Sequence, residues 1–270
     1  IQSSEFVKLF IIMYVSGYLV RRKEQLLNQW LGFAKPFVLL CAVVLLLLMQ
    51  PDFGAVVVIT VSVLGLIFLA GVPLQQFLPV ITLSSLTVSC IAIWQPYRLQ
   101  RLIAFAAPWE HQYSSGYQLT QALIAFGRGE WFGLGLGNSI QKLFFLPEAH
   151  TDFLFSILAE ELGALGAIAV IALFVCLICR ALWIGKRAHE IGEEFTGLLA
   201  YGIALLLSSQ IIINIGVNLG LLPTKGLTLP FVSYGGNSLV VCSICIAILL
   251  RIDYENSKKT LHTGRVRDAE

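Results

Sequence analysis

Charged residues are scarce in this sequence. Only 13% of its 270 residues are Asp, Glu, Lys or Arg, whereas soluble globular domains carry about a quarter. Hydrophobic residues make up 57% of the chain, so a soluble fold would have too few polar side chains to cover its apolar surface. This composition argues against a soluble enzyme, a nucleic-acid-binding domain and a disordered scaffold. It predicts an integral membrane protein.

Two short motifs that carry chemistry in soluble proteins lack their usual context here. Cys-x-x-Cys spacing occurs at 176–179 and 242–245, but no second pair of ligands flanks either one. All six cysteines lie in apolar stretches, where we expect them to act as small apolar residues without a disulfide framework. The alternate glycines at 133–137 follow no predicted strand, which argues against a nucleotide-binding fold.

Apolar runs long enough to cross a bilayer, which takes about 20 residues as a helix, recur along the chain. The first contains Glu5 and Lys8 in its opening turns, and Pro51 separates the second from the third. Those two could form a tight hairpin or one broken helix. The sequence therefore predicts an all-α fold, a polytopic transmembrane helical bundle. Its seven expected spans are 3–20, 36–50, 54–70, 77–95, 153–179, 197–221 and 232–250.

The distribution of basic residues predicts the orientation of these spans. Twelve of the 18 lysines and arginines fall in segments that lie inside the cell if the C-terminus is cytoplasmic. We therefore expect four spans in 1–95, an extracytoplasmic loop at 96–152, three spans in 153–250 and a cytoplasmic tail at 251–270. Because the chain begins at Ile1 with no methionine or signal peptide, we expect it to be a piece of a longer protein.

The loop at 96–152 has 57 residues, far more than most loops, which predicts a functional role. Leu119, Leu123 and Phe126 recur at helical spacing, opposite two glutamines. This pattern is typical of a short amphipathic helix. Such a helix would lie either on the bilayer surface or on the protein's own outer face.

Ionisable side chains at the ends of the spans are candidate functional residues. Asp152 ends the long loop, where it would act as a general base or simply cap the next helix. Glu148, His150 and Asp152 alternate, so they would project to one side of an extended segment. Glu148 and Asp152 are then candidates for holding a divalent cation. Asp52 lies in a Pro-Asp-Phe-Gly stretch, where turn geometry alone would explain it.

Polar side chains also occur inside the predicted spans. Glu160 and Glu161 point about 100° apart on a helix and cannot both face the centre of one cavity, so we expect one of them to meet a neighbouring helix or a basic partner. Gln210, Asn214 and Asn218 recur every four residues and form one amide stripe down a helix. The amide stripe would serve interhelical hydrogen bonding or form the polar wall of a water-filled cavity.

An irregular segment at 222–236, rich in proline, glycine and hydroxyl residues, follows the amide stripe. Irregular backbone is tolerated at membrane depth where it lines a cavity, so we expect this segment to re-enter there. Lys225 is its only charge. The ammonium would either hold a phosphate as a point charge or snorkel to a lipid headgroup.

The sequence contains several long motifs that resemble those of the SEDS family (shape, elongation, division and sporulation), and in particular those of its division members. The motifs also occur in the same order. The resemblance runs from Ile1 to about Tyr254, and Asn237 stands where relatives often have serine, a change we expect to be tolerated. The motifs are Gln50-Pro51-Asp52-Phe53-Gly54, Pro96-Tyr97-Arg98 with Arg101, Gly116-Tyr117-Gln118-Leu119, Phe126-Gly127-Arg128-Gly129, Pro147-Glu148-Ala149-His150-Thr151-Asp152-Phe153, Glu160-Glu161-Leu162-Gly163 and Pro223-Thr224-Lys225-Gly226-Leu227-Thr228-Leu229-Pro230.

The resemblance implies a protein of about ten spanning helices, of which this chain would hold the last seven. It implies polymerisation of lipid II into peptidoglycan strands, with a lipid pyrophosphate leaving group. The expected partners are a class B penicillin-binding protein and other division proteins, at the division site of the cytoplasmic membrane. A divalent cation is the one cofactor left open.

The family's key carboxylate falls on Asp152, which would take the proton of the acceptor hydroxyl as it attacks. Cations would stabilise the departing pyrophosphate. The residues expected to bind substrate are Lys225, Arg98, Arg101, Asp52, Glu148, His150, Thr151 and Ser233.

Two other functions fit the same features. A lipid flippase or transporter also has polar stripes and broken helices, although no internal repeat is visible in this sequence. A non-catalytic scaffold of the division complex would use the long loop to dock a partner, and Gly216 and Gly220 would form a helix-pairing face. The polymerase is the leading hypothesis.

Overall fold

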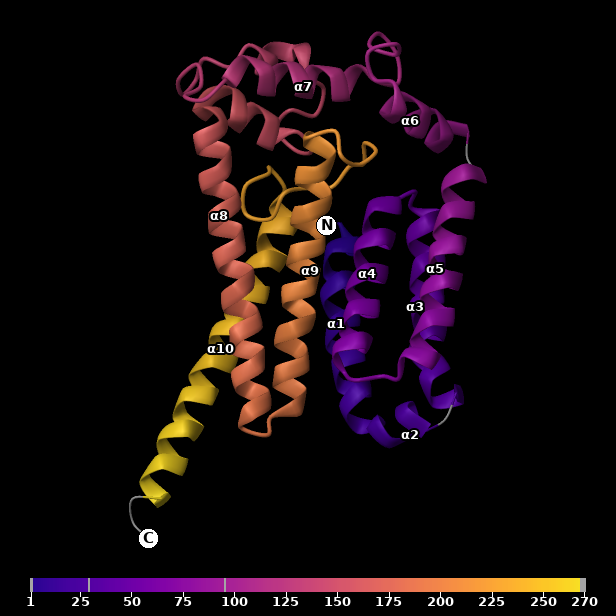
Figure 1. Cartoon of the computed structure of the whole chain (residues 1–270), viewed down its shortest axis with the longest axis vertical. Helices are drawn as coiled ribbons and strands as arrows, with labels where there is room; N and C mark the ends of the chain where they lie inside the picture. The colour runs from indigo at the N-terminus through magenta and orange to yellow at the C-terminus, as the bar shows by residue number, and fades with distance from the viewer. Residues whose placement is uncertain (1, 29, 95, 268–270) are drawn as a thin grey trace. The chain divides into compact units, whose positions relative to one another are not determined.

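The computed structural model describes residues 2–28, 30–94 and 96–267. Across these ranges the chain is helical and contains no strand, in agreement with the predicted fold class (Figure 1). Helices occupy all seven segments expected to span the membrane. They are α1 (Ser3–Arg21), α3 (Trp30–Met49), α4 (Phe53–Leu69), α5 (Leu74–Trp94), α8 (Leu154–Glu190), α9 (Glu194–Asn218) and α10 (Gly236–Arg267).

Five of these helices, α1, α5, α8, α9 and α10, are long and apolar enough to cross a membrane. Two shorter apolar helices, Lys35–Met49 and Phe53–Leu69, accompany them. The chain is therefore a multi-pass, all-helical membrane protein. Shorter helices connect the others: α2 (Lys23–Asn28), α6 (Pro96–Ala106), α7 (Tyr117–Gly129) and a single π-helical turn, η1 (Gln141–Phe145).

The chain forms two compact units, each made of separate stretches of sequence. The first unit comprises Ile1–Thr82, Leu177–Ser208 and Leu239–Glu270. The second unit comprises Leu83–Cys176 and Ser209–Ser238, and it includes the whole of the loop at 96–152. Helices α5, α8, α9 and α10 contribute residues to both.

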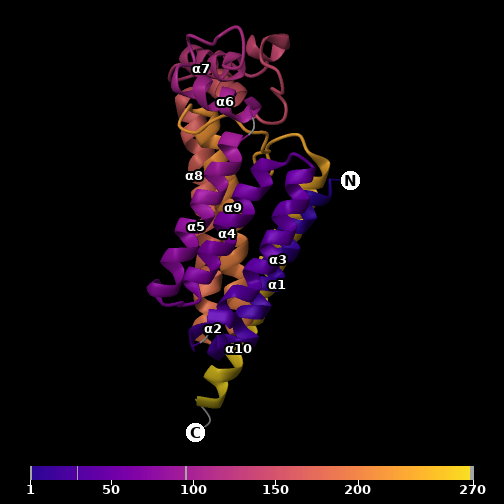
Figure 2. The same cartoon turned by 90° about the vertical axis from the view of Figure 1, so that its right-hand side faces the viewer.

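In the first unit, α1, α3 and α4 lie side by side (Figures 1 and 2). A turn at Pro51, where φ is 27°, joins α3 to α4, so the two form a hairpin rather than one broken helix. The charges in α1 are buried as a pair, because Lys8 Nζ lies 2.8 Å from Glu5 Oε1. Mutual neutralisation explains how this helix accommodates two ionisable side chains.

In the second unit, α7 packs on the protein itself. Leu119 is buried, and the ring of Phe126 lies 5.8 Å from that of Phe155 in α8. The amphipathic helix predicted from sequence is therefore present. Its apolar face covers the protein's own residues, which was the second of the two alternatives.

Helix α8 is broken at Gly163, whose φ of 72° and ψ of −175° are not helical. Main-chain groups of the preceding loop bond to the helix around the break. Leu134 N donates to Glu160 O at 3.0 Å, and Ala164 N donates to Glu130 O at 2.8 Å. The glycine-rich stretch of the loop therefore satisfies backbone groups that an unbroken helix would satisfy itself.

Candidate functional site

The carboxylate loop, residues 147–153, connects η1 to α8 and is a compact turn. The main-chain N–H groups of Thr151 and Asp152 both donate to Glu148 O at 3.2 Å. Glu148 itself has a φ of 57°, in the left-handed region. The expectation of an extended segment, with Glu148, His150 and Asp152 projecting to one side, is therefore wrong.

The conformation of the carboxylate loop also affects the predicted divalent-cation site. In the part of the chain that the structure describes, no three His, Cys, Asp or Glu residues are placed to hold a metal ion. Glu148 and Asp152 are the two carboxylates of the carboxylate loop. A cation site there stays a prediction that rests on two side chains.

The return segment, residues 219–235, joins α9 to α10 without regular structure, as the sequence predicted. Gln210 Nε2 donates to Thr228 O at 2.9 Å, although α9 continues to Asn218. At 1.5 Å per residue, the segment therefore turns back along α9 by about 12 Å. It also meets the carboxylate loop, because Tyr234 N donates to His150 O at 2.9 Å.

The amide stripe holds the carboxylate loop in place. The Nδ2 atoms of Asn214 and Asn218 donate to the main-chain carbonyl of Asp152 at 3.0 and 2.9 Å. Asn218 Oδ1 accepts a hydrogen bond of 2.6 Å from Ser156 Oγ in α8. The amides of the stripe are all at most 2% exposed. Burial with these partners supports the hydrogen-bonding role over a water-lined wall.

The carboxylate of Asp152 is half-buried beside Gly226. A Cβ at Gly226 would lie 3.1 Å from Asp152 Oδ2, so the glycine leaves room for this carboxylate. Helix α8 begins at Leu154, so its N-cap position falls on Phe153 and not on Asp152. The structure therefore does not use Asp152 as the cap that the sequence allowed.

The pKa of the Asp152 carboxyl is raised to about 6, chiefly by burial and also by the neighbouring charge of Glu148. The guanidinium of Arg101 partly opposes both effects. A carboxyl with this pKa is mostly ionised at neutral pH and still basic enough to accept a proton. These properties suit a general base.

Two of the predicted cations lie at the return segment. Arg101 is on α6, and its Nη1 donates to Thr224 O at 3.2 Å. Lys225 is the next residue and is half-buried. Arg98 is also on α6, but its side chain lies outside the described residues.

Three other predicted substrate-binding residues belong to the two segments that meet at Asp152. Thr151 Oγ1 donates to Glu148 Oε2 at 2.8 Å within the carboxylate loop. Ser233 Oγ accepts a hydrogen bond of 2.8 Å from Leu229 N within the return segment. The exposed His150 joins the two segments through its main-chain carbonyl.

Asp52 belongs to the first unit, whereas the residues described above belong to the second. Its Oδ1 atom accepts a hydrogen bond of 3.0 Å from Ala55 N, and it is the N-cap of α4. The structural explanation of Asp52 is therefore sufficient for its position. Its role in substrate binding stays a prediction.

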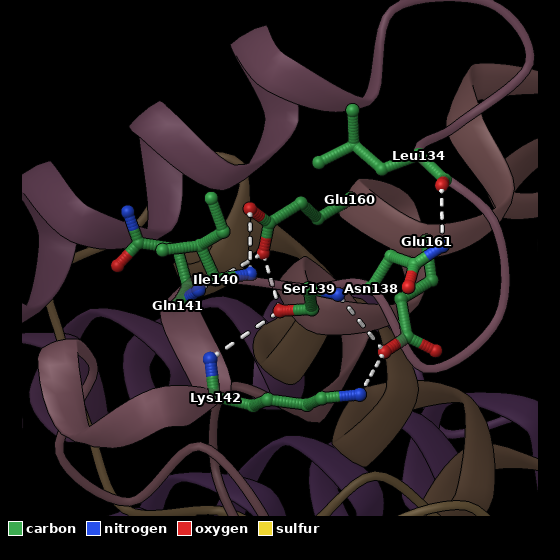
Figure 3. A network of polar contacts seen from close by, with 8 residues as sticks. All are labelled: Leu134, Asn138, Ser139, Ile140, Gln141, Lys142, Glu160 and Glu161. Carbon is green, nitrogen blue, oxygen red and sulfur yellow. Dashed lines mark hydrogen bonds and ion pairs between the residues drawn. The ribbon is translucent and has the colours of Figure 1, made fainter.

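A second polar network fixes the long loop to α8 (Figure 3). Glu160 is completely buried and accepts hydrogen bonds from Ser139 Oγ and from Gln141 N. Glu161 Oε1 lies 2.7 Å from Lys142 Nζ, so it meets a basic partner, one of the two alternatives that the sequence left open. Although their side chains point in different directions, both carboxylates hold the same stretch of the loop.

Sequence reasoning missed how the site is held together. It identified Asn214 and Asn218 by their spacing, but not their common acceptor, the Asp152 carbonyl. It also missed Gly226, although a glycine directly after the only charge of an irregular segment was a usable signal. The shared acceptor of the two amides and the close approach of Gly226 to Asp152 both arise only in the tertiary structure.

Comparison with known proteins places the chain in a family. It matches the FtsW/RodA/SpoVE family model, described as cell cycle protein, over residues 1–258. It is 54% identical over 256 residues to the probable peptidoglycan glycosyltransferase FtsW of Pseudomonas fluorescens, covering 95% of this chain and 63% of that protein. The protein of the same name in Hahella chejuensis is 55% identical over 255 residues, with 94% and 64% covered. The chain thus spans slightly less than two thirds of these relatives.

Solved structures show the same fold. A chain from a study of the structural coordination of polymerization and crosslinking by a peptidoglycan synthase complex matches with a TM-score of 0.75 and 27% identity, covering 95% of this chain and 70% of that one. The crystal structure of Thermus thermophilus rod shape determining protein RodA matches with a TM-score of 0.65 and 25% identity, with 95% and 66% covered. Since the family model spans nearly the whole sequence, this chain belongs to the FtsW/RodA/SpoVE family of cell cycle proteins.

Proposed function

We propose that this chain is the part of a peptidoglycan glycosyltransferase that carries its catalytic carboxylate, and that the enzyme polymerises lipid II during cell division. Relatives more than 50% identical over nearly the whole chain bear the name of that activity. The observation that carries the proposal is the Asp152 carboxyl, half-buried, with a pKa of about 6, on a loop that buried amides hold in place.

In the proposed reaction, Asp152 accepts the proton of the acceptor sugar hydroxyl while that oxygen attacks the anomeric carbon of the donor. The new glycosidic bond forms as the bond to the lipid pyrophosphate breaks, with inversion at the anomeric carbon. Arg101 and Lys225 stabilise the negative charge on the departing pyrophosphate. Partial burial strengthens these charge interactions relative to water.

The decisive experiment separates polymerase from flippase. The full-length protein is reconstituted with its partner in liposomes that contain lipid II, and both glycan strands and transbilayer movement of lipid II are measured. We expect strands to form from lipid II supplied in the outer leaflet. Movement of lipid II without strand formation would contradict the proposal and favour the transporter.

We further propose a crosslinking partner of the class B penicillin-binding type at the division site. The likeness to a chain of a complex that coordinates polymerization and crosslinking supports this partner. Co-purification of the full-length protein with such a partner tests the assignment. A scaffold function would require the complex to form while its lipid II polymerisation did not depend on Asp152.

We also propose that residues 96–152 face the outside and that α10 ends in the cytoplasm, as the basic residues predict. Ser115 is exposed in the loop between α6 and α7. A cysteine placed there, with the native cysteines replaced, should react with a membrane-impermeant maleimide added outside intact cells. Labelling at Lys258→Cys should require permeabilised cells, and the reverse pattern would refute the orientation.

A further inference from the structure

A cavity of about 630 Å³ lies in the first unit, and none of the candidate site residues described above lines it. It is formed by the end of α1, the turn between α4 and α5, and the ends of α8 and α9 that adjoin their short connection. This volume is typical of sites that bind small molecules or parts of larger ones. Much of its wall is apolar, with Leu19, Val20, Leu69, Leu182 and Leu198.

The polar residues of the cavity leave an excess of positive charge. Lys23 and Glu194 both line it, and they neutralise each other at 2.5 Å. Lys186 and His189 line it as well. The nearest carboxylate to Lys186 is that of Glu190, 3.8 Å away, and both of these side chains are exposed. Such an exposed pair is weak, so Lys186 remains available to an anion.

Aromatic and arginine side chains add to the positive charge and the apolar surface around the cavity. Trp183 lines the cavity. Arg187 lies over its ring at 5.4 Å and Arg180 at 4.4 Å, and Arg180 also pairs with Asp253. Tryptophan and arginine together are typical of the zone where lipid headgroups meet acyl chains.

The position of the cavity along the helices points to a lipid. Four helices that qualify as membrane spans begin or end beside it: α1 at Arg21, α5 at Leu74, α8 at Glu190 and α9 at Glu194. The cavity therefore lies at the boundary between the membrane and water. In the orientation proposed above, which follows the positive-inside rule, this end lies on the cytoplasmic side.

We propose that this cavity binds an anionic glycerophospholipid of the cytoplasmic leaflet. The phosphodiester lies at Lys186 and His189, and part of one acyl chain lies against the leucines. Basic recesses between spanning helices on this side of a membrane suit anionic headgroups. The proposal concerns the first unit alone and does not rest on glycosyltransferase activity.

The test titrates the full-length protein in detergent with phosphatidylglycerol and phosphatidylcholine of identical acyl chains, and native mass spectrometry counts the bound lipid. Because one lysine near a headgroup contributes about a fivefold difference in affinity, phosphatidylglycerol should bind about fivefold more tightly. Lys186→Gln should abolish most of this preference. Lys258→Gln, at an exposed lysine of α10 that does not line the cavity, should preserve it.

Two further arms identify the ligand. Ala70→Phe, which fills the cavity next to Leu69, should weaken binding of both lipids, whereas inorganic phosphate should not displace phosphatidylglycerol. Equal binding of the two lipids, a preference that survives Lys186→Gln, or full displacement by phosphate would each overturn the proposal. Binding of a polyprenyl pyrophosphate in place of the phospholipids would overturn it too.

Discussion

Two aspartates of this chain have related local sequences and different surroundings. Asp52 directly follows Pro51, Asp152 lies five residues after Pro147, and each is followed by phenylalanine and an apolar helix. Asp52 is the N-cap of its helix, with Oδ1 3.0 Å from Ala55 N. Asp152 lies one position farther from its helix, and buried amides hold its main chain. A neighbouring helix, rather than the local motif, therefore decides whether a carboxylate caps its helix or stays available for chemistry.

The largest contrast should appear when each aspartate is changed to asparagine in the full-length protein. Asparagine keeps the size of the side chain and caps helices about as well, but it cannot accept the proton. We expect Asp152→Asn to lower glycan synthesis from lipid II by about 100-fold or more. If Asp52 serves only as a cap, Asp52→Asn should change it by no more than about twofold, because the cap is preserved. A larger loss would support its predicted role in substrate binding.

Lipid II binding and solution behaviour provide the controls for this pair. Both variants should remain monodisperse and bind lipid II as the unaltered protein does. A folded Asp152→Asn protein with near-normal synthesis would end the catalytic assignment. An equal loss in both variants would remove the distinction between the two carboxylates.

The next contrast concerns Lys225, which precedes Gly226 in the return segment. If Lys225 stabilises the leaving pyrophosphate, Lys225→Ala should lower turnover by about 100-fold, the scale of losing one group that stabilises transition-state charge. Lys225→Arg should retain part of the activity, since it keeps the charge but changes its shape. The measurement is steady-state polymerisation with saturating lipid II. Unchanged turnover in a folded alanine variant would leave this lysine with a snorkelling role only.

The pH dependence gives a smaller but more specific contrast. Because the general base must be ionised and its pKa is about 6, kcat/KM should fall about tenfold for each pH unit below 6. Glu148→Gln removes a charge that raises this pKa, so the acidic limb should move to lower pH. Asp52→Asn should leave the limb in place. If Glu148→Gln leaves the acidic limb of the pH profile unchanged, that limb reflects the titration of a group other than Asp152.

The smallest expected effect concerns the amide stripe. Asn214→Leu removes one donor to the Asp152 carbonyl, and it should lower the free energy of unfolding by about 1 kcal/mol, the scale of a hydrogen bond in a membrane protein. Gln210→Leu removes a donor to Thr228 O in the return segment and leaves both amide donors to the Asp152 carbonyl in place. It should cost a similar amount without moving the pH limb. Thermal unfolding and the pH profile are measured together. Abolished activity with an unchanged melting temperature would show that Asn214 does more than hold the loop.

The apolar helices were predictable because crossing a bilayer requires long apolar segments, and such segments are visible in the sequence alone. The conformation of the carboxylate loop was not predictable in the same way. Alternation of Glu148, His150 and Asp152 suggested an extended segment, but Glu148 O accepts hydrogen bonds from the main chain a few residues later. The main-chain hydrogen bond from Tyr234 N to His150 O joins residues far apart in the sequence, so no local sequence pattern predicts it.

The amide stripe and α7 show the same limit. Spacing placed Asn214 and Asn218 on one face, but their acceptor is set by a loop that folds back only in the tertiary structure. Periodicity gave α7 an apolar face, but it could not say whether lipid or protein covers that face. The contact between the rings of Phe126 and Phe155 decides for protein.

At the break in α8, the loop and the helix approach so closely that neither side has room for a side chain. A Cβ at Gly133 would lie 2.2 Å from Glu161 O, and one at Gly163 would lie 2.5 Å from Gly133 N. Nearby, Phe132 and Leu136 are 83% and 77% exposed, so their identity can vary at little cost to folding. Adding or deleting one residue here would instead shift every main-chain donor past its acceptor. This stretch should therefore tolerate many substitutions outside its glycines while resisting any change in its length.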